Sequence, residues 1–386
     1  MSSEDIDVYR KLQQHLDQLP VGFPPSKSGV EIRMLKHLFA PEEAKIATNL
    51  KFSWNNTEPL ENIYERVKPL GYTMEELEKH LENMVKKGSI MVHIKGDKKT
   101  YGNAMFLIGI FEYQVDKLTK EFVEDMNQYW WEAWIPESAK IPISQTRLIP
   151  VEQSVRPEIG ISNYEVLKEV INSSEGPFVL IDCVCRQGKD LLGEPCKATS
   201  RRDVCVGFGP WLQVAIDMGD VKEITKEEAL DKLQKNQEEG LILMSNNAQK
   251  PDFVCSCCSC CCEGIATINK LPNPSDLIAT NYYAEVDSDL CTGCETCIDT
   301  CQLGAITLKD DVSSVNRTRC IGCGNCVAVC PSEALNLHKK EQQTVPPLTA
   351  VELYDEYLKI KAKREEKELK RKQRREKRKL IAEQVK

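Results

Sequence analysis

The sequence lacks the features that mark secreted, membrane-spanning and nucleotide-dependent proteins. Its N-terminus is charged and carries no apolar core of the kind found in a secretory signal peptide. No stretch approaches the ~20 apolar residues of a membrane span, and the longest apolar run, residues 104–111, has the length of a strand. No GxGxxG motif lies in a β–α–β context, so no flavin or nicotinamide site is expected. We therefore expect a cytoplasmic protein without a membrane span.

Histidine is scarce and cysteine is abundant. The 386 residues include five histidines and 18 cysteines. In a reducing compartment, clustered cysteines indicate metal or redox chemistry rather than structural disulfides. The composition therefore predicts metal–thiolate sites.

Two cysteine runs have the spacing of a bacterial two-cluster ferredoxin. Each run reads C-x2-C-x2-C-x3-C, and the second is followed by a proline. In such modules the fourth cysteine of each run binds the other cluster. Two [4Fe–4S] clusters are therefore predicted, because disulfides and zinc ribbons fit this spacing poorly. The predicted ligands are Cys291, Cys294, Cys297 and Cys330 for the first cluster, and Cys320, Cys323, Cys326 and Cys301 for the second.

The two ferredoxin halves differ after their fourth cysteine. Pro331 occupies this position in the second run, whereas Gln302 occupies it in the first. We expect this difference to leave ligation intact and to make the two cluster potentials unequal. Gly293, Gly322 and Gly324 are expected to permit turns and to let backbone amides approach the clusters.

Ten further cysteines lie upstream in a denser pattern with no histidine among them, and all ten are predicted metal ligands. They are Cys183, Cys185, Cys196 and Cys205 in the first set, and Cys255, Cys257, Cys258, Cys260, Cys261 and Cys262 in the second.

Three interpretations of these ten cysteines are open. The two sets could hold one or two further [4Fe–4S] clusters. The first set, residues 183, 185, 196 and 205, could instead form a structural zinc site. Thirdly, an unusual cluster could leave a thiol facing a substrate for disulfide chemistry. Adjacent cysteines are difficult to place around one zinc ion, because neighbouring side chains point apart in an extended chain.

The rest of the chain predicts an α+β protein of several domains. Residues 1–135 contain helices followed by a hairpin with strands at 89–95 and 100–110, which resembles a winged helix and is assigned a docking role. Glu75, Glu76 and Glu78 lie at the start of the helix that would read bases, so nucleic acid is not an expected partner. Residues 136–156 are predicted to be a linker, 157–280 a cysteine-rich β–α–β domain, 281–340 the ferredoxin domain and 341–386 a charged helical tail.

Capping boxes that start helices are predicted for Thr73 with Glu76, Thr225 with Glu228 and Thr349 with Glu352. Each ferredoxin half is predicted to be a cysteine loop, a short helix and a strand.

Aromatic and basic clusters suggest contacts within and beyond the chain. Trp130, Trp131 and Trp134 are expected to pack between domains. Residues 361–379 hold twelve basic and four acidic residues and so carry a charge of +8. Because the whole chain has a net charge of −8, the rest of it carries about −16. This stretch is expected to be a solvated helix or a disordered tail, and an acidic redox partner is a candidate ligand for it.

Together the motifs resemble a family of multi-domain iron–sulfur proteins of anaerobes. The resemblance is carried by DCVCRQGKDLLGEPC with Cys205, by ITKEEALDKL, by VCSCCSCCC and by the two ferredoxin runs, over roughly residues 157–340. It implies electron transfer and leaves the final substrate open.

The sequence therefore predicts an electron-transfer protein or subunit that relays single electrons between redox partners, rather than a stand-alone enzyme. One alternative is a thiol/disulfide reductase subunit that uses the middle cysteines. The other is a redox-sensing DNA-binding regulator with the winged helix as its output.

Overall fold

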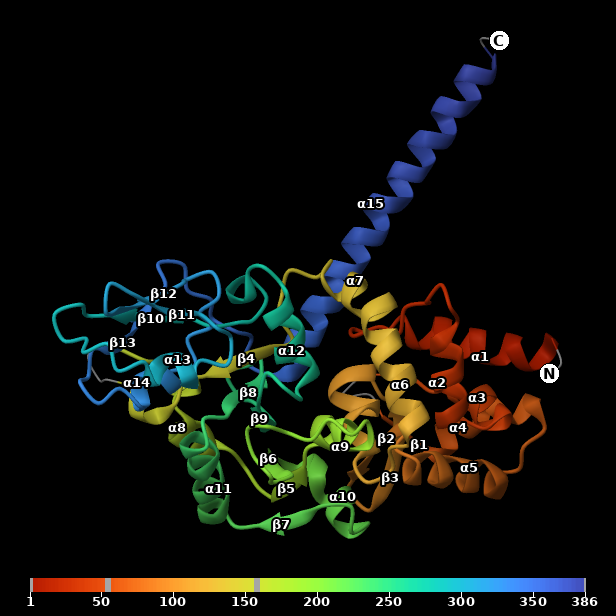
Figure 1. Ribbon diagram of the computed structural model, residues 1–386. Coiled ribbons are helices and arrows are strands. Elements are labelled where there is room, and N and C mark those ends of the chain that lie inside the picture. Colours follow the sequence, from red (N-terminus) through yellow and green to blue (C-terminus); the bar gives the residue numbers. More distant parts are fainter. Residues whose placement is uncertain (1–2, 53–56, 156–159, 385–386) are drawn as a thin grey trace.

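A computed structural model describes residues 3–52, 57–155 and 160–384 (Figure 1). Helices and strands are mixed along the chain, which confirms the predicted α+β class. Within these ranges the strands form sheets of three, six, two and two strands. No helix in the same ranges is long and apolar enough to cross a membrane. The division into five domains stays a prediction.

The N-terminal part builds a helical core against a three-stranded antiparallel sheet with the order β1–β3–β2. Its elements are α1 (Ser3–Leu16), α2 (Val30–Leu38), α3 (Pro41–Ala47), β1 (Glu58–Pro59), α4 (Leu60–Val67), α5 (Met74–Lys86), β2 (Ile90–Lys95) and β3 (Lys98–Asn103). The predicted capping box starts α5: the Thr73 hydroxyl accepts a hydrogen bond from the Glu76 N–H, and the Glu76 carboxylate accepts one from the Thr73 N–H. Apolar faces of α1, α2 and α5 meet in one core.

The prediction that the second hairpin strand extends to residue 110 is wrong. Strand β3 ends at Asn103, and Phe106–Ile110 forms an irregular turn. Ile108 adopts a left-handed conformation with φ 53°, and the Gly109 N–H donates a hydrogen bond to the Glu112 carboxylate at 2.9 Å. Buried side chains such as Phe106 and Ile110 explain the apolar run, because they fill the helical core rather than a sheet.

The tryptophan-rich segment connects the N-terminal core to the middle of the chain. It follows α6 (Lys120–Tyr129) and continues as a helical turn, Trp130–Trp134, into α7 (Ile135–Ser138). Trp130 is buried, stacks on Trp134 and donates a hydrogen bond from Nε1 to the Thr267 hydroxyl at 2.7 Å. Thr267 belongs to α12 (Glu263–Lys270). The expected packing role is therefore found for Trp130.

The middle of the chain forms a six-stranded sheet with the order β4–β8–β9–β6–β5–β7. Its strands are β4 (Thr146–Ile149), β5 (Phe178–Asp182), β6 (Asp203–Phe208), β7 (Lys222–Ile224), β8 (Ile242–Asn246) and β9 (Phe253–Cys257). Every strand pair in it is antiparallel. The expected order of strands and helices is therefore present, and the sheet that the strands form is antiparallel. Residues 136–156, the predicted linker, contribute edge strand β4, where flanking prolines are tolerated.

Helices cover the two faces of this sheet unequally. The helices are α8 (Leu167–Ser173), α9 (Val184–Leu191), α10 (Gln213–Asp217), α11 (Lys226–Glu238) and α12. Side chains of α8 and α11 pack on one face, with Val206 of β6 and Val254 of β9. Because side chains alternate along a strand, the cysteines of β6 and β9 point to the opposite face.

The ferredoxin module consists of two similar halves. Its elements are β10 (Tyr282–Val286), α13 (Thr296–Thr300), β11 (Ile306–Lys309), β12 (Val312–Val315), α14 (Asn325–Ala328) and β13 (Leu335–Lys339). Strand β10 pairs with β13, and β11 pairs with β12, both antiparallel. Each cysteine loop is thus followed by a short helix and a strand, as the repeat predicts.

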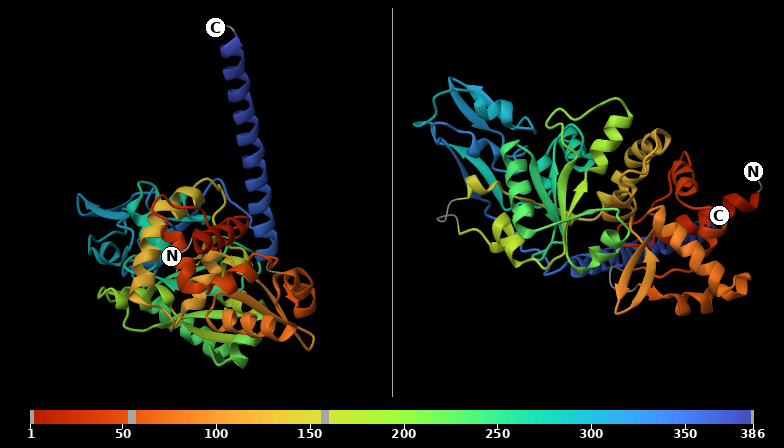
Figure 2. Two further views of the ribbon diagram at one scale, coloured as in Figure 1. Left: turned by 90° about the vertical axis from the view of Figure 1, so that its right-hand side faces the viewer. Right: turned by 90° about the horizontal axis from the view of Figure 1, so that it is seen from below.

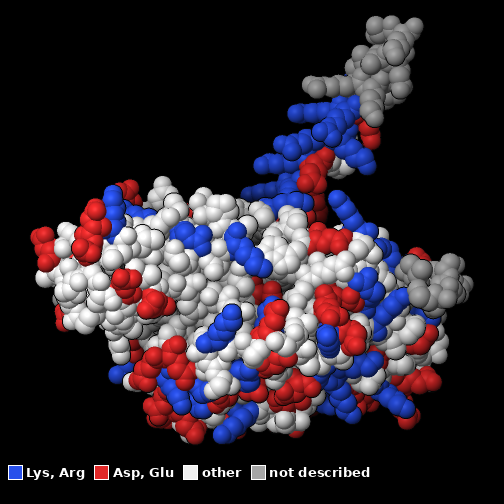
Figure 3. All heavy atoms as spheres, viewed as in Figure 1, with Lys and Arg blue, Asp and Glu red and all other residues white. Residues whose placement is uncertain are grey.

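Helix α15 (Ala350–Gln384) starts on the N-terminal core and then leaves the body of the protein (Figures 1 and 2). Leu353, Tyr354 and Tyr357 are buried in that core. The Thr349 hydroxyl caps the helix as expected, by accepting a hydrogen bond from the Glu352 N–H. The Glu352 carboxylate accepts from Leu348 N, however, and not from Thr349 N. Of the two predicted forms of the tail, the structure shows the helix, and its Lys and Arg side chains between residues 367 and 377 are exposed (Figure 3).

Candidate metal–thiolate centres

The first ferredoxin site is a small pocket near the surface. Cys291, Cys294, Cys297 and Cys330 line it together, although Cys330 comes from the other cysteine run. Ser313 of β12 adds two contacts: its N–H donates to Cys291 Sγ at 3.4 Å, and its hydroxyl lies 3.3 Å from Cys297 Sγ. Cys294 is exposed. This arrangement of four thiols and a backbone donor fits an iron–sulfur cluster that can meet a partner protein.

The second ferredoxin site is more deeply buried. Burial raises the pKa of Cys320, Cys323 and Cys326, to about 12 for Cys323, and negative charge on Cys301 adds to the effect. The Ala284 N–H donates to Cys320 Sγ at 3.3 Å, and the Ala305 N–H donates to Cys301 Sγ at 3.2 Å. Interacting thiols, two of which are buried and two partly buried, need a positive charge to ionise, which bound iron would supply.

Glycine is required beside the second site. Gly322 has φ 69°, and a Cβ there would lie 2.3 Å from the Tyr282 carbonyl oxygen. The turn expected from the sequence is present, and the close backbone approach that the structure shows is to strand β10; the approach of amides to the clusters stays a prediction.

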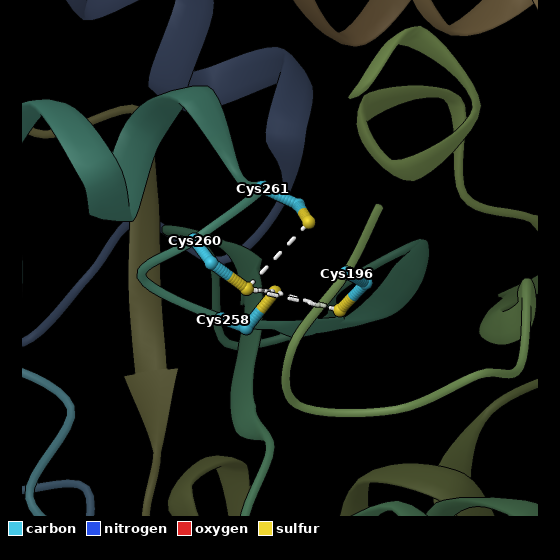
Figure 4. A group of neighbouring side chains, drawn as sticks. All are labelled: Cys196, Cys258, Cys260 and Cys261. Atoms are coloured by element: carbon cyan, nitrogen blue, oxygen red, sulfur yellow. Dashed lines mark hydrogen bonds between the residues drawn. The ribbon is translucent and has the colours of Figure 1, made fainter. Parts of the chain in front are cut away.

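The ten middle cysteines divide into a group of four and a group of six. The four-thiol group consists of Cys196, Cys258, Cys260 and Cys261, whose sulfur atoms all lie within 4.8 Å of one another (Figure 4). Cys196 Sγ lies 3.7 Å from Cys258 and 3.8 Å from Cys260. Cys260 Sγ lies 3.5 Å from Cys258 and 3.6 Å from Cys261.

This division corrects two expectations. The zinc site proposed from residues 183, 185, 196 and 205 is not formed, because Cys196 lies with Cys258, Cys260 and Cys261, apart from the other three. Adjacent cysteines do converge, since residues 259–261 form a turn rather than an extended chain. The side chains of Cys260 and Cys261 therefore point toward the same centre.

The other six middle cysteines form a closed ring of interacting thiols, which we call the six-thiol ring. In order around the ring they are Cys183, Cys185, Cys262, Cys257, Cys255 and Cys205. The pKa of Cys183 lies well below its ordinary value, because Cys183 accepts hydrogen bonds from Cys185 and Cys205. The pKa of Cys262 is lowered likewise by Cys185 and Cys257.

Strand register and helix starts assemble the ring. Cys255 and Cys257 share one face of β9, and the pairing of Val206 with Val254 puts Cys205 beside Cys255. Cys183 and Cys262 immediately precede α9 and α12. Helix N-termini favour negative charge, so both helices help to hold thiolates or an anionic metal centre.

Arg186 lies between the two groups and is 1% exposed. Its Nε donates to Cys196 Sγ at 3.4 Å, its Nη2 to Cys258 Sγ at 3.5 Å and its Nη1 to the Ser256 carbonyl at 3.0 Å. Negative charge on Cys183 and Cys258 raises the pKa of Arg186, against the opposing effect of its burial. A buried guanidinium of this kind requires anionic partners, which metal-bound thiolates provide.

A cavity of about 830 Å³ opens onto the six-thiol ring. All six ring cysteines line it, and none of the four-thiol group does. Trp130, Trp134 and Trp211 contribute to its walls. Glu112 also lines the cavity, and burial raises the pKa of its carboxyl to about 7. This volume lies within the range of small-molecule sites.

Buried contacts connect the ferredoxin module to the middle cysteines. Cys301 and Cys323 pack against the same hydrophobic cluster as Cys255, Cys257 and Cys262 of the six-thiol ring. The cluster includes Leu148, Ile242, Met244, Ile265, Ile278, Leu303 and Ile321.

Gln302 provides a second connection. Its Oε1 accepts a hydrogen bond from the Ser259 N–H at 2.8 Å, and its Nε2 donates to the Gly240 carbonyl at 2.6 Å. Ser259 lies between Cys258 and Cys260 of the four-thiol group. The glutamine that departs from the ferredoxin pattern is therefore a contact to the middle sheet.

Some functional residues were not predicted from the sequence. Arg186 stands out only as a charge within DCVCRQGKD, and Ser313 belongs to no cysteine motif. The contacts that make them important come from strands and loops distant in the sequence.

The comparisons with known proteins support the C-terminal assignment. A family model of the 4Fe-4S dicluster domain matches residues 283–331. No curated protein and no solved structure matches the chain. Residues 283–331 therefore place a ferredoxin-like iron–sulfur module in this protein.

Proposed function

We propose that the protein relays single electrons between an external redox partner and a metal centre held by the six-thiol ring, by way of the ferredoxin module. The observation that carries this proposal is the shared hydrophobic cluster. Cys301 and Cys323 of the module and Cys255, Cys257 and Cys262 of the ring all belong to this cluster or pack against it. The side chains between the two sites are therefore buried.

The burial of the sites gives the relay a direction in space. The first ferredoxin site reaches the surface at Cys294, whereas Cys320 and Cys326 of the second site are buried. The hydrophobic cluster that Cys301 and Cys323 of the second site contact also contacts the six-thiol ring. Clusters bound at the ferredoxin sites supply one-electron redox chemistry, and the chain positions, buries and hydrogen-bonds their ligands.

The ligands and the docking domain are part of this proposal. Cysteines 291, 294, 297 and 330 bind the first cluster, and cysteines 320, 323, 326 and 301 bind the second. The N-terminal 135 residues act as a winged-helix-like docking domain, which the order of α4, α5 and the β1–β3–β2 sheet supports. Redox partners of acidic surface dock on the exposed basic part of α15 in a cytoplasmic, anoxic setting.

Metal and sulfide analysis tests the relay. Two [4Fe–4S] clusters account for about eight iron and eight acid-labile sulfide per chain. The anaerobically purified full chain is expected to exceed both values. Cys257→Ser should remove the excess while the electron paramagnetic resonance of the reduced ferredoxin clusters remains. Cys326→Ser is the reciprocal control and should affect the ferredoxin signals first. A wild-type value of about eight for both elements would refute the relay to the ring.

The cavity favours a second candidate function, the reductase. An apolar disulfide bound against the ring would accept two electrons and two protons, and its S–S bond would break to give two thiols. The electrons would come from a low-potential donor through the ferredoxin module.

Turnover of diphenyl disulfide under dithionite tests the reductase. Ala215 lines the cavity and is partly exposed, so Ala215→Trp should fill it and abolish turnover. Ala362→Trp introduces the same side chain at an exposed position of α15 outside the cavity and should leave turnover unchanged. Equal turnover in both variants would exclude the cavity as the site.

A further inference from the structure

We propose that Cys196, Cys258, Cys260 and Cys261 bind one divalent metal ion, in a tetrathiolate site that is separate from every iron–sulfur cluster of the protein. This inference goes beyond the proposed electron relay, because it assigns four of the ten middle cysteines to a centre that contains no inorganic sulfide.

The distances between sulfur atoms carry the argument. Zinc bound by four cysteines has Zn–S distances of about 2.3 Å, so the edges of its tetrahedron are about 3.8 Å long. Four of the six Sγ–Sγ distances in the group are 3.5, 3.6, 3.7 and 3.8 Å, and all six lie within 4.8 Å. The thiols are therefore spaced for a single ion at their centre.

A cubane cluster needs wider spacing, because each thiolate binds a different iron atom. The two ferredoxin quartets provide an internal comparison. Among the residues that the structure describes, the four-thiol group is the one set of potential metal ligands with all ligand atoms within 4.8 Å. The structure describes all eight ferredoxin cysteines, yet in neither quartet do all four sulfur atoms lie within 4.8 Å of one another.

The surroundings match the charge of such a site. One divalent ion and four thiolates carry a net charge of −2, which is costly to bury without a counter-charge. Arg186 donates to two of the four sulfur atoms and is itself buried. Arg202 lies near enough to Cys196 for the two groups to interact electrostatically.

A metal ion here would join two segments that have little regular structure. Cys196 lies in the connection between α9 and β6, and the other three ligands lie in the turn that follows β9. The same turn presents the Ser259 N–H to Gln302 of the ferredoxin module. The ion therefore stiffens the surface on which the module rests.

Element analysis of the full chain tests this site. Cys260→Ser should lose about one equivalent of zinc or iron with no loss of acid-labile sulfide. Zinc loss identifies a structural site, and loss of a single iron identifies a rubredoxin-type site; both support the inference. Ser259→Ala is the matched control, because it alters the same turn, keeps the backbone N–H and should retain all metals.

Two results would overturn the inference. One is the loss of about four iron and about four sulfide from Cys260→Ser, which would indicate a cubane cluster. The other is unchanged metal content. X-ray absorption at the zinc edge, to which the iron of the clusters does not contribute, tests a bound zinc ion without depending on folding of the variant. It should show the ion with four sulfur neighbours at about 2.3 Å and no nearby iron, and a metal–iron distance would contradict the site. Failure of this site would leave the ferredoxin-to-ring relay standing, because that relay depends on the other six cysteines.

Discussion

Gln302 connects two parts of the protein through both ends of its side-chain amide. It follows Cys301 directly, and its partners are the Ser259 N–H and the Gly240 carbonyl. Pro331 occupies the equivalent position in the other ferredoxin half and is exposed. The backbone at this position accepts proline in the second half, so the glutamine in the first half serves the contact between modules.

Replacing Gln302 should loosen that contact without removing the clusters. Gln302→Pro loses two side-chain hydrogen bonds, worth about 1 kcal/mol each. We expect a fall of about 2 kcal/mol in the free energy of unfolding and faster hydrogen exchange at the Ser259 amide. Pro331→Gln is the matched control and should change neither quantity. Unchanged exchange at Ser259 in Gln302→Pro would show that the contact does not hold the turn.

Substitution of Arg186 should weaken the binding of the middle-domain metal without removing any of its cysteine ligands. Loss of a group that contacts metal ligands typically weakens metal binding 10–100-fold. Arg186→Gln removes the positive charge beside Cys196 and Cys258 and should release the middle-domain metal to a chelator at 10–100-fold lower chelator concentration. Arg202→Gln, which breaks an ion pair with Asp190 nearer the surface, should have a smaller effect. Equal release from both variants would argue against a specific role for Arg186.

Sequence spacing predicted the ferredoxin sites more completely than the middle sites. The spacing of the two runs is local and has one established geometry, so the structure brings Cys330 to the first run as predicted. The division of the middle cysteines depends on the register of β6 with β9 and on the turn at residues 259–261. Neither can be derived from the spacing, because both are set by contacts between distant segments.

At the scale of secondary structure, α15 has two parts with different roles. Its first turns bury Leu353 and Tyr357 in the N-terminal core, and the Tyr357 hydroxyl donates to the Ile143 carbonyl at 2.6 Å. Lys361 donates to the backbone carbonyls of Asp17 and Leu19. Beyond Arg364, the contacts found among the described residues lie within the helix itself.

Truncation of the exposed part of α15 and substitution of its buried part should therefore affect the free energy of unfolding differently. A chain that ends after Arg364 should keep the free energy of unfolding of the full protein, because the removed residues are solvated. Leu353→Ala should lower it by about 2–5 kcal/mol, as expected for a buried leucine. Urea unfolding of both proteins checks this pair. A large destabilisation by the truncation would show that the distal helix packs on the body.

Capped helices were the elements that the sequence located best. The Thr73 and Thr225 capping boxes both form, and α5 and α11 begin where they predict. The run at 104–111 and the strand β4 were missed for a common reason. Apolar residues can fill a helical core or a sheet equally well, and short segments carry too little periodicity to distinguish the two.

At the scale of the whole molecule, the six-stranded sheet separates the ferredoxin module from the N-terminal core (Figure 1). The ring cysteines lie where the three parts approach one another: they line the cavity with Trp130 and Tyr357, and they share a hydrophobic cluster with Cys301. This location allows electrons to arrive from one side and a small molecule or partner to be accommodated on the other. We propose that the ring holds a redox centre in contact with the module.

Controlled-potential coulometry of the anaerobic full chain tests this claim most directly. The two ferredoxin clusters take up about two electrons, one each. The wild-type protein should take up more than two electrons, and Cys257→Ser should take up about two. An uptake of about two electrons by both proteins would contradict the claim.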